Sequence, residues 1–229
     1  MLLCFSFSAA ASQITLFTPA NSVEPADNTH PVDAEAIVTT GNGTVTVQLF
    51  DLLTAAQMHD AGQLLSDFFF TLPGTFATVS NTNENTPSGT LFDINGSTPT
   101  ATIGKWGFSD SSSSGSTTFH IDDLNNGNSP TQTIIGGTVG ESSSHYTNAN
   151  PSLTGNHNPF VQGEETFVLN IAGVTSNTAI TSGVFSFGTD SGGNITGVPS
   201  TVPEPRTTGF IVAAGLVMAF ALRRKKFVS

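Results

Sequence analysis

The sequence predicts an all-β protein: an antiparallel, jelly-roll-like β-sandwich followed by a single C-terminal transmembrane helix. Three observations predict it. Apolar and polar residues alternate in several short segments, turn-rich polar stretches separate those segments, and an uncharged apolar segment lies near the C-terminus. With 229 residues, the chain has room for one β domain of ordinary size. The expected parts are a signal-peptide remnant, the β-sandwich, a linker, the membrane helix and a basic cytoplasmic tail, at 1–12, 13–198, 199–206, 207–222 and 223–229.

The first residues, MLLCFSFSAAASQ, resemble a secretory signal peptide. Leu2–Phe7 is mostly apolar, and Ala9 and Ala11 form a small-x-small cleavage site. The segment is short and lacks a positive start, so an ordinary first β-strand is the alternative. Cys4 is the single cysteine of the chain. A cleaved protein would therefore have no disulfide, cysteine metal site or cysteine nucleophile.

Period-two alternation with β-branched and aromatic residues is typical of half-buried strands. It is clearest at 44–49, 119–121, 166–171 and 185–187. Further expected strands are Phe68–Leu72, Phe76–Ser80, Ala101–Phe108 and Thr131–Ile135. Polar turns are expected at Asn81–Gly89, Ser109–Ser116, Asn125–Pro130 and Glu141–Gly163. Leu52–Ser66 predicts one short helix, and Asn194–Glu204 is the expected linker.

The charges are unevenly distributed along the chain. Residues 1–205 carry 17 acidic side chains and a single basic one, Lys105. Such a surface repels nucleic acid and anionic lipid headgroups, so nucleic acid is excluded as a partner. It suits a secreted protein that charge repulsion keeps soluble, or one that meets cations.

The C-terminal segment has three parts in a fixed order. Pro203 and Pro205 flank Glu204 and predict an extended, accessible backbone. Thr207–Leu222 follows, with 16 residues and no charge. As a helix it would span about 24 Å, somewhat less than the roughly 30 Å of bilayer hydrocarbon. The basic residues come next, so the body is expected to face outward. They are Arg223, Arg224, Lys225 and Lys226.

These three parts resemble the PEP-CTERM sorting signal of bacterial envelope proteins. The resemblance covers about the last 26 residues, from the Val202-Pro203-Glu204-Pro205 motif through the basic cluster. It implies export, transient anchoring in the inner membrane, processing at the motif by an exosortase-type membrane transpeptidase, and delivery to the cell surface or extracellular matrix. Family members are commonly associated with exopolysaccharide or biofilm. The stretches "ETFVLNIAGV" and "GVFSFGT" are similar to the last strands of other PEP-CTERM proteins, which implies a domain of no assigned activity.

One stretch, Thr189-Asp190-Ser191-Gly192-Gly193, resembles the nucleophile loop of chymotrypsin-like proteases. The comparison fails because Thr189 stands where that family has glycine, and because the chain after Gly193 is too short to complete a second barrel. A polar turn after the last strand is the expected structure. No catalytic residue is therefore assigned.

Metal ligands are not evident from spacing. The five histidines are His30, His59, His120, His145 and His157, and none are spaced as a helical metal pair. Asp122, Asp123 and Asp190 are the calcium candidates, because they put oxygen ligands into loop-like stretches. Solvated turns are the alternative, and no cofactor is otherwise expected.

Two further features bear on carbohydrate chemistry. Glu164 and Glu165 are expected to point to opposite faces of a solvated edge strand, which does not suit a glycosidase pair. Trp106 and Tyr146 could stack on a sugar, but a lone tryptophan in an alternating strand is more often part of a core. The sequence thus predicts a non-catalytic surface or matrix protein, and the resemblance implies its association with exopolysaccharide or biofilm. The alternative is a secreted polysaccharide-binding module or hydrolase.

Overall fold

The computed structural model describes residues 11–76, 88–100, 104, 106–124, 132–155, 157–190 and 192–200. The chain divides into two compact units, Met1–Pro199 and Ser200–Ser229, and the fold concerns the first. Ala9, the sorting motif, the apolar tail and the basic cluster lie outside the described residues, so the predictions about them stay predictions. Within the described ranges, no helix is long and apolar enough to cross a membrane.

Twelve strands joined in one sheet confirm the predicted all-β class. The strands are β1 Gln13–Phe17, β2 Ala34–Thr40, β3 Thr44–Asp51, β4 Leu65–Pro73, β5 Ser88–Phe92, β6 Gly107–Ser113, β7 Ser116–Asp122, β8 Ile134–Ile135, β9 Phe160–Asn170, β10 Ser182–Phe187, β11 Asn194–Thr196 and β12 Val198–Pro199. The helical turns are η1 Ala55–Gln57, η2 Ala61–Gln63, η4 Ser143–His145 and α1 Pro151–Thr154.

The sheet folds over into two layers, as in a β-sandwich. One layer has the order β12-β1-β2-β3-β9, with β5 also on β9, and the other contains β11-β10-β4-β7-β6. The short strand β8 joins them, because it pairs with β4 and with β9. Gly183 of β10 shows how closely the layers approach. A Cβ there would lie 2.5 Å from a methyl carbon of Leu16 in β1 and 2.8 Å from the Phe68 ring in β4.

The interior between the layers is apolar and rich in phenylalanine. Along β2 and β3 every second residue is buried, as alternation predicts for strands with one face on a core. From the other layer, Phe68 and Phe70 of β4 point into the same core. Ring contacts continue from Phe70 to Phe119 at 5.1 Å and from Phe68 to Phe185 at 5.2 Å. This burial supplies the main favourable free energy of the fold.

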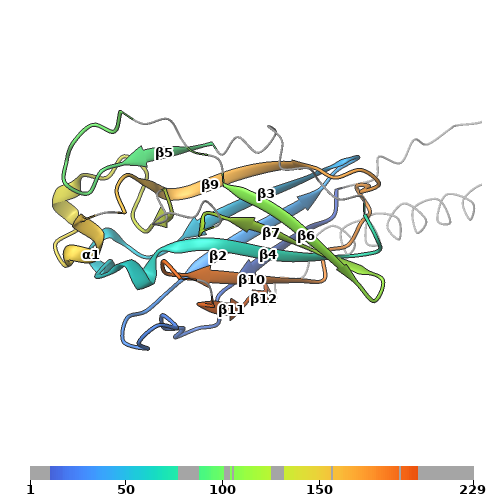
Figure 1. The fold of residues 1–229 in the computed structure, drawn as a ribbon, viewed down its shortest axis with the longest axis horizontal. Coiled ribbons are helices and arrows are strands. Elements are labelled where there is room, and N and C mark those ends of the chain that lie inside the picture. Colours follow the sequence, from blue (N-terminus) through green and yellow to red (C-terminus); the bar gives the residue numbers. More distant parts are fainter. Residues whose placement is uncertain are drawn as a thin grey trace, which may run out of the picture. The chain divides into compact units, whose positions relative to one another are not determined.

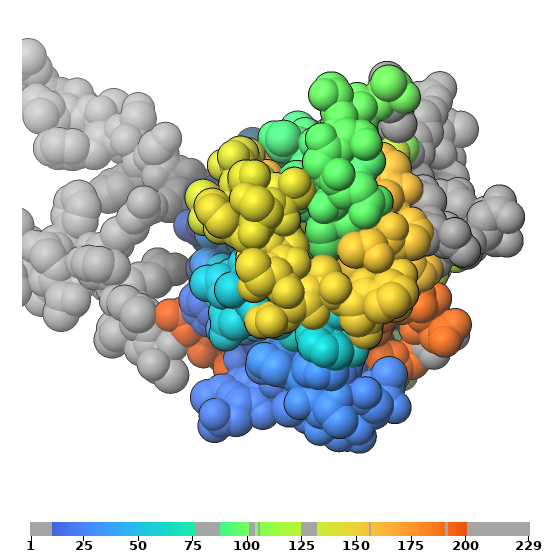
Figure 2. All heavy atoms as spheres, turned by 90° about the vertical axis from the view of Figure 1, so that its left-hand side faces the viewer, coloured from blue at the N-terminus to red at the C-terminus, as the bar shows by residue number. Residues whose placement is uncertain are grey.

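A second, smaller apolar cluster lies where the helical turns gather, at the left of Figure 1. It contains Met58, Leu64, Tyr146, Leu153 and Phe160, among others. Figure 2 looks at this end directly and shows the segments around residues 20–33 (blue), 52–64 (cyan) and 140–158 (yellow) side by side. Loops distant in sequence therefore meet at this end of the molecule.

The expected helix over Leu52–Ser66 is replaced by two single-turn helices, η1 and η2. Each begins at its own capping residue, Thr54 or Asp60, and each has a glutamine three positions later that closes a capping box. Two helix starts within one short segment prevent a continuous helix. The apolar side chains that suggested a helix, such as Leu53 and Leu64, are buried in the smaller cluster instead.

Three other expectations are corrected. The expected turn at Ser109–Ser116 is mostly strand, because β6 pairs with β7 and only Ser114 and Gly115 form the turn. The strand β6 is polar because, among the described strands, it pairs only with β7, and its far end is exposed. The expected linker is sheet up to Pro199, since β11 pairs with β10 and β12 with β1. The third correction concerns the expected jelly-roll arrangement. Strands β1, β2 and β3 are neighbours in sequence order within one layer, whereas a jelly roll is built from two Greek keys.

We expect Phe167→Ala to lower the free energy of unfolding by about 3–5 kcal/mol, because it leaves a cavity in the core and removes the ring contact with Trp106. The neighbouring Val168 is 46% exposed on the same strand, so Val168→Ala should cost less than about 1 kcal/mol. Urea denaturation of both variants measures the difference. Equal losses would contradict the assignment of the two faces of β9.

Candidate functional site

The calcium candidates Asp122 and Asp123 lie at the end of β7 and are buried, not solvated. In the sheet register Asp122 is opposite Asp67 of β4, which is also buried. The third candidate, Asp190, is exposed on the turn after β10 and does not join them. The structure therefore brings together two of the three predicted residues and adds Asp67. The sequence analysis did not identify Asp67, because it directly precedes the apolar Phe68-Phe69-Phe70 stretch.

Backbone groups hold these carboxylates in place. The amide of Asp123 donates to Asp67 Oδ1 at 3.2 Å, and the amide of Leu124 donates to Asp122 Oδ1 at 2.6 Å. Asp123 Oδ2 is buried and has no hydrogen-bond partner in the described part of the chain. An unpartnered buried carboxylate oxygen is costly, so this oxygen favours a proton or a cation.

Glu165 of β9 joins the same buried region from the opposite layer. Glu164 is exposed and Glu165 is fully buried, so the two point to opposite faces as expected. The expected solvated edge is wrong, because β9 is paired with β3 on one side and with β5 and β8 on the other. Neither carboxylate oxygen of Glu165 has a hydrogen-bond partner within the described ranges. We call Asp67, Asp122, Asp123 and Glu165 the buried carboxylate cluster.

Burial raises the pKa of three members of this cluster. The pKa of Asp67 rises to about 8, first because of desolvation and then because of Asp122. Desolvation and the charge of Asp122 likewise raise the pKa of Asp123 to about 8. Glu165 reaches a pKa of about 8 through desolvation and the charge of Asp123. These groups therefore keep their protons at neutral pH, which removes most of the mutual repulsion.

His120 lies beside the buried carboxylate cluster. Its Nδ1 is 3.8 Å from Asp122 Oδ2, and its ring stacks on Phe69 at 3.8 Å. Burial lowers the pKa of His120, against the opposing charge of Asp122. Asp67, His120 and Asp122 offer three ligand atoms within 4.8 Å of one another. Calcium requires about 6–8 oxygen ligands, so these three residues alone do not make a calcium site. Bound protons neutralise the carboxylates without any further ligand.

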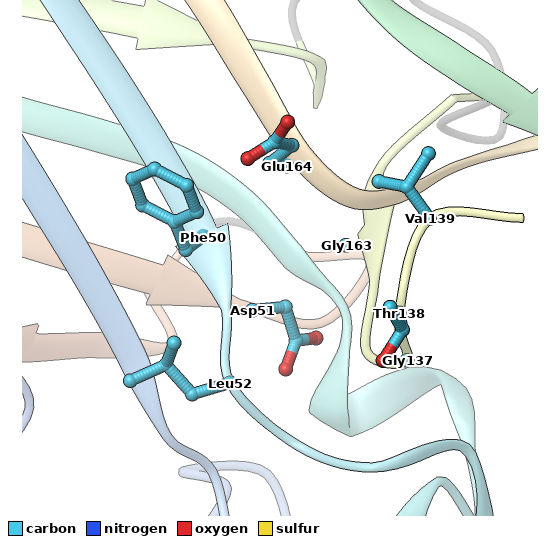
Figure 3. A pocket seen from close by; sticks show the side chains of 8 residues that line it. All are labelled: Phe50, Asp51, Leu52, Gly137, Thr138, Val139, Gly163 and Glu164. Atoms are coloured by element: carbon cyan, nitrogen blue, oxygen red, sulfur yellow. The ribbon is translucent and has the colours of Figure 1, made fainter. Parts of the chain in front are cut away.

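Two surface hollows lie elsewhere on the described part of the molecule. One, of about 360 Å³, is lined by Phe50–Leu52, Gly137–Val139, Gly163 and Glu164. Figure 3 shows that the carboxylates of Asp51 and Glu164 point away from one another in this hollow. Asp51 is fully buried, and desolvation raises its pKa well above the ordinary value. The hollow therefore does not present the facing acid and base that glycoside hydrolysis requires.

The other hollow, of about 470 Å³, borders the turn at 189–193. Asp190 and Gly188–Thr189 line it, together with Pro25, Ala26 and Gly62 from other loops. The turn connects β10 to β11, and the amide of Phe187 donates to the carbonyl of Gly193 at 2.9 Å. This is the polar turn that the sequence predicts, while Ser191 itself lies outside the described residues.

The two aromatic residues that could have stacked on a sugar are both in the interior. Trp106 is 3% exposed and contacts Phe167 at 5.1 Å between ring centroids, so its expected core position is confirmed. Tyr146 is 6% exposed, and its hydroxyl donates to the carbonyl of Gly136 at 2.6 Å. Neither ring offers a face to a saccharide in this structure.

The histidines are less scattered than the sequence suggests. His145 forms a local pair with Glu141 at 2.9 Å. His30 and His59, however, stack with their ring centroids 4.1 Å apart, and both contact Asp60. The spacing of the histidines in the sequence does not predict this ring contact, because His30 and His59 come from different loops.

No protein-family model matches this sequence. The curated proteins and the solved structures likewise contain no significant match to it.

We expect the protein to become less stable as the pH rises from 4.5 toward about 8, partly because of Glu165. Its folded-state pKa is raised, so the folded protein retains a proton that the unfolded chain loses in this window. Stability is therefore greatest below pH 4.5 for this group and falls through its folded pKa, by at most about 1.4 kcal/mol per pH unit.

Glu165→Gln should reduce this slope, because the amide does not titrate. Glu164→Gln changes an exposed neighbour on the same strand and should leave the slope as it is. Urea denaturation across that pH window measures all three proteins. The same slope in Glu165→Gln as in the unsubstituted protein would contradict the raised pKa of Glu165.

Proposed function

We propose that this chain is an exported, non-catalytic cell-surface or extracellular-matrix protein with a PEP-CTERM sorting signal. The observation that carries the proposal is the order of Pro203-Glu204-Pro205, an uncharged segment of 16 residues and four consecutive basic residues. In this proposal an exosortase-type transpeptidase cleaves at the motif while the tail anchors the protein transiently in the inner membrane. The body then remains at the surface or in the matrix.

The boundary of the folded unit supports this order of events. The compact unit ends at Pro199, where β12 pairs with β1, and the motif begins at Pro203. Cleavage at the motif would therefore remove none of the strands that the structure describes. The body would keep its core and its sheet after processing, as a delivered surface domain must.

The proposed role of the body is association with exopolysaccharide or biofilm. Its acidic charge suits solubility outside the cell and contact with cations, and does not suit nucleic acid. The alternative, a polysaccharide-binding module or hydrolase, receives less support. The buried Trp106 and Tyr146 offer no stacking platform, and the closely placed carboxylates Asp67 and Asp122 lie in the interior, not in an open cleft.

The tail proposal predicts the mass of the mature protein. In the native host we expect the mature form to end near Pro203–Arg206 and to lack the N-terminal signal and basic tail. Replacement of Pro203, Glu204 and Pro205 by alanine should leave the full C-terminus in the inner-membrane fraction. Intact mass spectrometry of envelope and medium fractions measures both outcomes.

Pro199→Ala is the matched control, because it changes an exposed proline just before the motif. This variant should be processed like the unsubstituted chain. A full-length C-terminus on the unsubstituted protein would show a plain membrane anchor, and the proposal of exosortase sorting would then be wrong.

A further inference from the structure

Two loops far apart in sequence meet at the end of the molecule shown in Figure 2. The first connects β1 to β2 and narrows at a bridge between Val23 and Pro31. Within it, the amide of Glu24 donates to the carbonyl of His30 at 2.9 Å. The second loop joins η1 to η2 and carries His59 and Asp60. We call the residues that meet there the two-loop cluster: Glu24, Asp27, His30, His59 and Asp60.

The ligand atoms of this cluster converge. His30 Nδ1 lies 2.7 Å from Glu24 Oε1 and 3.0 Å from Asp60 Oδ2. His59 Nδ1 lies 3.4 Å from the same oxygen of Asp60. Atoms of Glu24, Asp27, His30 and Asp60 all lie within 4.8 Å of one another, and so do those of His30, His59 and Asp60. Two ligands of a zinc ion, each about 2.0–2.2 Å from it, lie at most about 4.4 Å apart, so little contraction is needed.

Other residues hold the cluster in this arrangement. The fully buried Gln63 accepts from the amide of His59 at 2.6 Å and donates to the carbonyl of Pro31 at 2.8 Å, so it ties the two loops together. Asp60 caps η2, since its Oδ1 accepts from the amide of Gly62 at 2.9 Å. That bond leaves Asp60 Oδ2 directed at the two imidazoles. Partners of this kind orient ligands in established metal sites.

Gly62 provides the space that the cluster occupies. A Cβ atom at this position would overlap Glu24 Oε2, at 1.9 Å, so any side chain here would displace the carboxylate. Glu24 itself is almost completely buried, with 2% of its side chain exposed. A buried carboxylate that packs against a glycine and contacts His30 is a cradle for a cation, and no lysine or arginine among the described residues fills it. All six lysines and arginines of the chain fall outside the described residues.

The carboxylates of the two-loop cluster also repel one another when no cation is bound. Ligand atoms of Glu24, Asp27 and Asp60 lie within 4.8 Å of one another, and Glu24 is almost completely buried, so its charge is both repelled and poorly solvated. A divalent ion would relieve this repulsion and compensate the desolvated carboxylate.

We propose that the two-loop cluster binds one divalent transition-metal ion, represented by Zn²⁺. The donor chemistry favours this class over calcium, because imidazole nitrogen suits zinc and its neighbours, whereas calcium takes oxygen ligands. His59 and His30 keep 42% and 27% of their side chains exposed, which gives an ion a path from solvent. The bound ion would link the β1–β2 connection to the helical turns at this end.

The experiment uses the full chain, purified without a histidine tag and treated with a chelator. Isothermal titration calorimetry with Zn²⁺, and separately with Ca²⁺, measures affinity and stoichiometry. We expect one Zn²⁺ per chain, little response to Ca²⁺, and a higher unfolding temperature when Zn²⁺ is present. X-ray absorption of the zinc-loaded protein should show imidazole ligands.

The key variant is Asp60→Asn, because asparagine can still cap η2 through its side-chain oxygen while the second carboxylate oxygen is lost. Zn²⁺ affinity should fall at least about tenfold in this variant and in His59→Ala. His145→Ala is the matched control, since it removes a more exposed histidine that also contacts a carboxylate, and it should leave Zn²⁺ binding unchanged. Circular dichroism checks that each variant is folded.

Three outcomes would overturn the proposal. The first is the absence of stoichiometric Zn²⁺ binding by the unsubstituted chain. The second is equal Zn²⁺ affinity in folded Asp60→Asn and in the unsubstituted protein. The third is Ca²⁺ binding in place of Zn²⁺, lost in Asp60→Asn, because it would assign the cluster to a different class of ion.

Discussion

Neutralisation of closely spaced, buried carboxylates is the constraint on which the polar interior of the described unit depends. The described ranges contain no lysine or arginine, and within them the carboxylates contact backbone amides, histidines and one another. Asp67 and Glu165 are buried with pKa values raised to about 8, which keeps them protonated.

Protonation of these carboxylates affects both layers, because the buried carboxylate cluster contains residues from each. Asp67 and Asp122 come from β4 and β7, while Glu165 comes from β9 in the other layer. Ionisation of all these groups would place like charges in positions that are shielded from water. The phenylalanine packing stabilises the sandwich, and loss of protons from these carboxylates at higher pH would oppose that packing.

Much of the sandwich could be predicted from the sequence, because strands with one buried face alternate visibly. β3 and β10 have large apolar residues at every second position, whereas β2 buries Ala34 and Ala36, whose small side chains give a weaker signal. The prediction of one helix over Leu52–Ser66 was wrong. Thr54 and Asp60 each cap a separate single-turn helix, and the apolar spacing of the segment does not show these two starts.

The sites were much less predictable than the strands. Asp122 was identified as a candidate, but its partner Asp67 could be found only from the register between β4 and β7. The two-loop cluster depends on a contact between Gln63 and Pro31, residues that nothing in the local sequence relates. Long-range pairing therefore decides which polar residues meet, while local patterns decide only which strands form.

The same charge asymmetry connects the body to the proposed processing of the tail. In this proposal, four consecutive basic residues would hold one end of the acidic chain at the membrane before cleavage. After cleavage at the motif those residues would be gone, and anionic headgroups would repel the acidic body, which would favour its release. A released acidic body can approach an anionic polysaccharide only where cations screen or bridge the two. Cation binding at one end of the sandwich would therefore act in the same direction as the proposed matrix role.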